Sequence, residues 1–379
     1  MMTPVELGKK VSAELASRAD ESNKNSKLNP ADIQSLTESG FSALSLPKEY
    51  GGHGASLRDC VAAMLELAQG NPSTALIAGM QMHVFGHNRE VRSWNEAKFE
   101  EFCQITLEQG GLFNSIATEP ALGSPSRGQI YKTSAEKTDG GYLLNGLKTW
   151  STGGEYLTHL LVRASVGKGI GVLAVENNSA GVEWEYTWRD VLSFRASESH
   201  DVHFKACPIS AENLIEYSEG PTKSRPNLWF AQVMSSIYLG AAIAARNTVV
   251  RYALERVPTA LGRPISTLPK IQRQIGEIDV QLQAARALLL EVAGEWSGRD
   301  EDRAALAARN AAAKVMATET ARDVTDKALR IAGGVSLTTA LPLERHFRDV
   351  RAGSMQPPSG DTALEIVGRA AISQLADQK

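Results

Sequence analysis

The chain has 379 residues, enough to bury a large core, and this length predicts two or three cooperating units. Hydrophobic residues make up 42% and charged residues 22%, a composition that excludes an intrinsically disordered chain. The 40 basic and 43 acidic residues give a net charge of -3, which excludes a field that recruits nucleic acid or an anionic membrane. We therefore expect a small-molecule partner.

Residues 1–112 show apolar positions at three- and four-residue spacing, which predicts an N-terminal helical domain. One helix is predicted to begin with Asn29 as its N-cap and Pro30 in its first turn, and to end at Gly40. The N-terminus lacks the apolar core of a signal peptide, and no later window holds about 18 apolar residues in a row. We expect a soluble, cytoplasmic protein with no membrane partner.

Residues 113–218 change to alternating apolar and polar positions, which predicts a central β domain. The segments 131–136 and 142–144 flank a turn at 139–141 and are typical of a hairpin. No helical stretch between the strands is long enough for the crossovers of a parallel sheet, so we expect an antiparallel one.

Residues 219–379 return to helical periodicity and predict a C-terminal four-helix bundle. Its helices are expected near residues 226–256, 268–298, 302–331 and 361–376, with Gly333 and Gly334 ending the third. The predicted fold class is α+β, with the order helical domain, β domain and helical bundle.

The sequence offers little for a metal or a disulfide. Its three cysteines are widely spaced and form no CxxC pair. His83 and His87 share a helix face at the spacing of metal-binding pairs, but the glutamate of the HExxH motif is absent. We predict no metal site.

The stretch from Ala117 to Thr152 combines a turn of small residues with a strand that ends Lys148-Thr149-Trp150-Ser151-Thr152. Backbone amides, hydroxyls and one large aromatic side chain therefore meet in one region. A flavin ring needs an apolar face and hydrogen-bond donors, and its phosphates need amides or cations. This set of groups suits a flavin.

Thr118 to Ser124 reads TEPALGS and Gly146 to Thr152 reads GLKTWST. Together they resemble the flavin-binding segment of the acyl-CoA dehydrogenase superfamily. Other segments resemble that superfamily's motifs in the same order, namely Leu192–Ser199, Phe204–Asn213, Tyr252–Arg256, Arg330–Gly334 and Arg348–Asp349. The resemblance covers roughly residues 40 to 375 and implies FAD as cofactor, with FMN possible.

The resemblance also implies roles for individual residues. Thr118 would offer backbone groups to the flavin ring, Ser124 would bind the pyrophosphate, Trp150 would pack on the ring, and Thr152, taken to lie on the same strand face, would donate to its N5 edge. The cofactor phosphates of a neighbouring subunit would be contacted by Arg256, Gly333 and Gly334. The expected assembly is a homo-oligomer, either a tetramer or a dimer.

The sequence departs from the superfamily at the catalytic base. The position of the usual glutamate is Pro357, and the superfamily's other base location falls near Trp229 and Phe230. An arginine that holds substrate corresponds to about Ala231. Two nearby carboxylates, those of Asp361 and Glu365, are weak candidates for a substitute base.

Three functions stay open. The first is dehydrogenation of an acyl-CoA-like thioester, with an electron-transfer flavoprotein as partner. The second is monooxygenation of another organic substrate by reduced flavin from a reductase. The segment MQPPSGD resembles the superfamily's reduced-flavin monooxygenase branch, whose reaction requires no base for an α-proton. In that chemistry Thr152 and His83 would supply hydrogen bonds. The third is a non-catalytic flavin-binding subunit.

Overall fold

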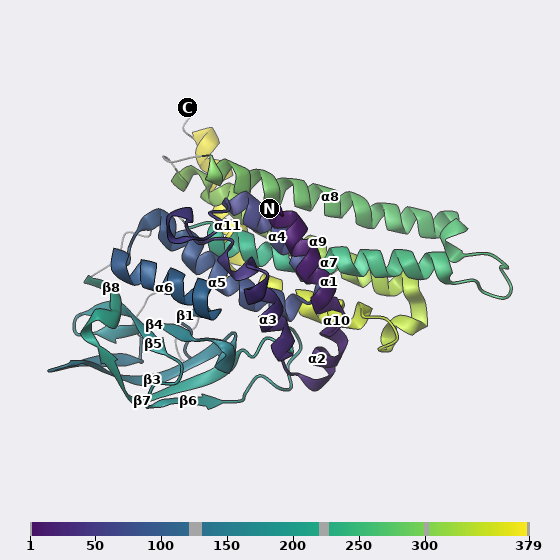
Figure 1. The fold of residues 1–379 in the computed structure, drawn as a ribbon. Coiled ribbons are helices and arrows are strands. Elements are labelled where there is room, and N and C mark those ends of the chain that lie inside the picture. Colours follow the sequence, from purple (N-terminus) through teal and green to yellow (C-terminus); the bar gives the residue numbers. More distant parts are fainter. Residues whose placement is uncertain (1, 121–130, 220–226, 299–302, 377–379) are drawn as a thin grey trace.

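The computed structural model describes residues 2–120, 131–219, 227–298 and 303–376 (Figure 1). A layer of N-terminal helices packs beside a twisted sheet, and long C-terminal helices cover the other side of the N-terminal layer. The expected Ser124 lies outside the described residues.

The N-terminal layer contains six α-helices over the described residues. Asn29 caps one of them as expected, because its side chain accepts a hydrogen bond of 3.0 Å from the Ala31 amide. Thr3 and Glu6 form a capping box at the first helix. The helices are α1 (Pro4–Ala16), α2 (Ala19–Asn25), α3 (Pro30–Glu38), α4 (Leu57–Gly70), α5 (Pro72–Val91) and α6 (Glu96–Gln109).

The central unit is one sheet with the order β6-β7-β3-β2-β4-β5-β8, and β1 pairs with β4 outside this path. The predicted hairpin is confirmed as β2 and β3, with Thr138 opposite Gly141. The strands are β1 (Phe113–Ile116), β2 (Ser134–Thr138), β3 (Gly141–Ser151), β4 (His159–Val166), β5 (Gly169–Glu176), β6 (Val182–Glu185), β7 (His200–Ser210) and β8 (Leu214–Glu219).

Two of these pairings correct the expectation of a wholly antiparallel sheet. β4 pairs with β5 along one edge, and its other edge runs parallel to β1 in its first half and to β2 at its end. The long connection that a parallel pair requires is supplied by intervening strands instead of a helix. The absence of crossover helices therefore did not exclude parallel neighbours.

The C-terminal unit is built on long helices that run side by side (Figure 1). Three of the four expected helices begin and end within a few residues of their predicted bounds, and the third expected helix begins later than predicted. The helices are α7 (Trp229–Glu255), α8 (Pro269–Ser297), α9 (Ala307–Ala332), a short α10 (Leu343–Asp349) and α11 (Gly360–Ala376).

The helix α7 lies at the centre of the protein, between the N-terminal helices α4 and α5 and the bundle helices α8 and α9. It is long and apolar enough to cross a membrane by length and composition, yet 78% of its most apolar window is buried inside the protein. Trp229 on α7 packs so closely on α5 that a Cβ added at Gly86 would lie 2.3 Å from the indole ring. This close packing ties the N-terminal layer to the bundle.

Candidate functional site

The end of β3 carries the residues that the sequence singled out. Trp150 is 64% exposed and has a left-handed backbone, with φ of 57°. The pairing of β3 with β7 is irregular between Lys148 and Ser151, and this bulge turns the indole outward. Thr152 follows the strand and is 4% exposed. The expectation that Trp150 and Thr152 share one strand face is therefore wrong, because the bulge breaks the alternation.

The two halves of the central motif are joined by a buried ion pair. The Glu119 carboxylate lies 2.8 Å from the Lys148 ammonium, and their side chains are 2% and 0% exposed. The Glu119 carboxylate also accepts from the amides of Lys132 and Thr133. The Thr149 amide donates to the Thr118 carbonyl at 3.0 Å. Thr118 therefore lies directly beside the strand that presents Trp150.

Burial has opposite effects on the two charges of this pair. Loss of solvation lowers the pKa of Lys148 to about 8, although the Glu119 carboxylate opposes this change. Burial tends to raise the pKa of Glu119, but its hydrogen bonds to Lys148 and Thr133 outweigh that effect and lower it. Sequence reasoning missed the pair, although both residues stand inside the quoted motifs.

The hydroxyl of Thr152 belongs to a buried polar cluster. It lies 2.9 Å from the Ser199 hydroxyl, which lies 2.7 Å from that of Ser197. The Thr152 carbonyl accepts from the side-chain amide of Asn114 at 2.9 Å. These contacts hold both the hydroxyl and the carbonyl of Thr152 in place. Neither serine was singled out from the sequence, although both stand in the motif 192–199.

These groups fit the ring of a flavin. Trp150 exposes a large aromatic face from a left-handed backbone position, and Thr152, two residues later, carries a buried hydroxyl. The hydroxyl of Ser151, between them in sequence, is buried and has no hydrogen-bond partner among the described residues. Trp150 and Thr152 would therefore hold the ring, with Thr118 beside them.

The segment that carries the two serines is tied to the bundle. The Phe194 amide donates to the Asp349 carboxylate at 2.8 Å, and the Ser193 hydroxyl donates to the Arg348 carbonyl at 2.6 Å. Burial raises the pKa of Asp349 to about 6, partly offset by the nearby Arg345. The Arg-Asp pair of the C-terminal unit thus positions a loop of the β domain.

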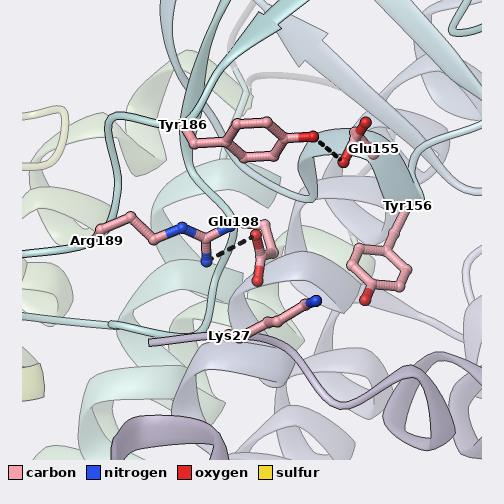
Figure 2. Close-up of a pocket in the computed structure, with 6 residues that line it drawn as sticks. All are labelled: Lys27, Glu155, Tyr156, Tyr186, Arg189 and Glu198. Carbon is pink, nitrogen blue, oxygen red and sulfur yellow. Dashed lines mark hydrogen bonds and ion pairs between the residues drawn. The ribbon is translucent and has the colours of Figure 1, made fainter. Parts of the chain in front are cut away.

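A cavity of about 310 Å³ is lined by Glu198 of this segment, at the junction of the β domain with the α2–α3 connection (Figure 2). The Glu198 carboxylate accepts from the Leu28 amide at 2.7 Å and lies 3.5 Å from Arg189. It also lies 2.7 Å from the His200 ring. Glu198 itself has φ of 49°, so these partners hold a strained residue between the two serines.

His83 lies on α5, half-buried, with its ring edge-on to Phe230 at a centroid distance of 5.0 Å. Burial lowers the pKa of His83 to about 3, with smaller contributions from His87 and Arg163. The imidazole is therefore neutral at pH 7 and offers one donor and one acceptor. The described residues contain no group of three or more His, Cys, Asp or Glu placed to hold a metal ion.

The positions expected for a catalytic base, and Ala231 at the position expected for a substrate-holding arginine, carry no ionisable side chain. Pro357 is exposed, Trp229 is fully buried, Phe230 packs on His83, and Ala231 is 4% exposed. The two substitute candidates, Asp361 and Glu365, lie exposed on α11. Neither side chain forms a hydrogen bond or ion pair within the described ranges, so nothing directs either carboxylate toward Trp150.

The residues expected to reach a neighbouring cofactor lie at one end of the bundle, where α7 and α9 both end (Figure 1). Arg256 caps α7 and is exposed. Gly333 and Gly334 follow α9, are exposed, and have open space where a Cβ would stand. All three belong to the bundle, whereas Trp150 belongs to β3 of the sheet.

Comparison with known proteins finds three family models along the chain. They are the N-terminal, middle and C-terminal domains of acyl-CoA dehydrogenase, which match residues 6–90, 115–207 and 232–356. The putative acyl-CoA dehydrogenase YdbM of Bacillus subtilis is 35% identical over 94% of this chain and 93% of its own length.

Solved structures share the fold. FMN-bound TdsC from Paenibacillus sp. A11-2 has a TM-score of 0.88 at 21% identity, with 98% of each chain covered. Butyryl-CoA dehydrogenase from Megasphaera elsdenii has a TM-score of 0.83 at 24% identity, with 97% of each covered. The three matched models and the 35% identity to YdbM over most of both chains show that this chain belongs to the acyl-CoA dehydrogenase family of flavin-dependent oxidoreductases.

Proposed function

We propose that this protein is a monooxygenase that uses reduced flavin delivered by a separate reductase. One observation carries the proposal: Pro357, Trp229, Phe230 and Ala231 place no ionisable group where the family removes a proton or holds a thioester substrate. Dehydrogenation needs a base within hydrogen-bond reach of the α-proton. A reaction that begins at the flavin and oxygen needs no such base.

The chain's residues would serve this reaction by binding and by hydrogen bonding. Trp150 would cover one face of the ring, and the Thr152 hydroxyl would bond its N5 edge. His83 is neutral and lies beside Phe230, so it would offer a hydrogen bond without adding charge to an apolar wall.

Reduced flavin would supply two electrons to molecular oxygen, so that one oxygen atom enters the organic substrate and the other leaves as water. The likeness to FMN-bound TdsC supports the fold and the room for such a cofactor. FAD is the proposed cofactor by family, with FMN the alternative.

Dehydrogenation of an acyl thioester is the second candidate, and the similarity to YdbM favours it. In that case Asp361 or Glu365 would have to act as the base, either in a neighbouring subunit's site or after a movement of α11. An electron-transfer flavoprotein would accept the electrons. Both carboxylates lie exposed within one chain.

We also propose that the protein works in the cytoplasm as a homotetramer. Arg256, Gly333 and Gly334 are exposed and lie at one end of the bundle, where they could contact the cofactor phosphates of another subunit. Exposed apolar side chains on the bundle support association, among them Leu337 at 84%, Ile372 at 71% and Leu375 at 68%.

Anaerobic titration of the flavin-loaded protein with acyl-CoA thioesters tests the proposal. The expected result is no bleaching of the flavin band, followed by oxygen uptake with product formation once reduced flavin and air are supplied. Bleaching by any thioester would overturn it in favour of dehydrogenation. Flavin binding without either reaction would indicate a non-catalytic subunit.

A further inference from the structure

Three buried hydroxyls form a continuous chain that ends at the candidate flavin site. Ser197, Ser199 and Thr152 are 0%, 3% and 4% exposed. Their oxygens are joined by contacts of 2.7 Å from Ser197 to Ser199 and of 2.9 Å from Ser199 to Thr152. In each contact either oxygen could be the donor, so the direction of the chain is not fixed by its geometry.

The backbone on both sides of the chain is fixed. The Gly153 amide donates to the Ser197 carbonyl at 3.0 Å, and the Ser197 amide donates to the Phe194 carbonyl at the same distance. Glu198, between the serines, is held by the Leu28 amide and the His200 ring, and by Arg189, whose contact Figure 2 shows. The chain can therefore change its proton order without moving its heavy atoms.

A hydroxyl has one proton, so its two contacts are linked. If Thr152 donates to a ligand, its oxygen must accept from Ser199, and the chain runs from Ser197 through Ser199 to Thr152. If Thr152 instead donates to Ser199, the order reverses, and the Thr152 oxygen can only accept from the ligand. The N5 atom of an oxidised flavin is an acceptor, whereas N5–H of the reduced ring is a donor.

We propose that Ser199, with Ser197 behind it, is a positioning residue that lets the Thr152 hydroxyl donate to the oxidised flavin ring and accept from the reduced one. The inference rests on the proposed function, because it requires a flavin whose oxidation state changes. No group is transferred to or from the chain: each hydroxyl keeps one proton, and reversal only rotates the three O–H bonds.

The test measures flavin binding and flavin midpoint potential for Thr152→Val, Ser199→Ala and the double variant. Loss of one hydrogen bond is expected to weaken binding of oxidised flavin about threefold to tenfold in either single variant. Ser199→Ala should add nothing in the Thr152→Val background, because its effect passes through Thr152. Ser199→Thr, which keeps the hydroxyl, should restore both binding and potential.

Ser165→Ala is the matched control, because it removes a hydroxyl that donates to a main-chain carbonyl at 2.8 Å elsewhere in the β domain. It should leave flavin binding unchanged. Additive effects of Thr152→Val and Ser199→Ala, or no effect of Ser199→Ala on the flavin midpoint potential, would overturn this inference and leave the proposed function standing. Wild-type protein that binds no flavin in either oxidation state would overturn the proposed function and the inference with it.

Discussion

The Glu119 carboxylate and the Lys148 ammonium form a 2.8 Å ion pair inside the protein, and it joins the loop after β1 to the strand that presents Trp150. The pair is asymmetric. The carboxylate keeps two backbone donors, from Lys132 and Thr133, at 2.8 Å and 3.0 Å. Within the described part of the chain the ammonium has one other hydrogen bond, to the Ala117 carbonyl at 3.3 Å, and it lies 4.3 Å from the ring centroid of Tyr131.

We predict that Glu119→Gln lowers the free energy of unfolding by about 3 to 5 kcal/mol, because it leaves a buried ammonium without its counter-ion. Lys148→Met should cost less, since the carboxylate keeps its backbone donors. The double variant should cost less than the two losses added together. Urea unfolding checks the cycle.

The exposed pair Lys205–Glu183 is the control for that cycle, with side chains 62% and 55% exposed. Glu183→Gln should change the free energy of unfolding by less than about 0.5 kcal/mol. Equal effects of Glu119→Gln and Glu183→Gln would contradict the importance of burial.

Asp349 should make the protein less stable as pH rises through the acid range. Its pKa is raised from 3.8 to about 6, so the folded protein binds a proton that the unfolded chain releases. The contribution is fully present below about pH 4 and is lost as pH rises through 6, with an upper limit of about 3 kcal/mol.

Asp349→Asn keeps an acceptor for the Phe194 amide but cannot ionise. It should flatten the dependence of unfolding free energy on pH between 4 and 6, and Asp361→Asn, at an exposed carboxylate, should not. An unchanged slope in Asp349→Asn would show that this carboxyl does not titrate there.

The sequence predicted the features that depend on local pattern. Helical periodicity located the long helices, whereas the flavin site at the motif around Trp150 and Thr152 stays a prediction. The sequence could not predict contacts between distant segments, such as the contact of Ser199 with Thr152, because a single sequence contains no distances. The bulge that exposes Trp150 also escaped prediction, since it depends on the pairing of β3 with β7.

Trp150→Ala should weaken flavin binding without lowering the stability of the folded protein. The indole is 64% exposed and its left-handed backbone favours no large side chain, so the unfolding midpoint of the flavin-free protein should change little. Flavin affinity should fall about tenfold, from lost stacking and lost apolar contact. Trp150→Phe should retain part of the affinity.

Tyr217→Ala is the control for Trp150→Ala, because it removes another exposed aromatic side chain, 44% exposed on β8. Fluorescence titration should show unchanged flavin binding in Tyr217→Ala. An equal loss in both variants would contradict a specific ring contact at Trp150.

Arg256→Ala tests the proposed contact with a neighbour's cofactor. A guanidinium that binds the pyrophosphate should matter for FAD more than for FMN, which has one phosphate. We expect about tenfold weaker FAD binding with FMN binding unchanged. Arg251→Ala, another exposed arginine on α7, is the control, and equal losses in both variants would refute the contact.

His83 should be neutral throughout the working range, because burial lowers its pKa from 6.5 to about 3. The unfolded chain binds a proton on this imidazole below about pH 6.5 and the folded protein does not, so His83 makes stability fall as pH drops from 6.5 toward 3. His83→Gln should remove part of that fall in stability, on the order of 3 kcal/mol after allowance for partial exposure.

The same variant, His83→Gln, should also slow oxygen-dependent product formation. The pH profile of the rate between 6 and 8 should not shift, since no titration of His83 occurs there. A wild-type inflection near pH 6.5 that disappears in His83→Gln would contradict a neutral imidazole at this position.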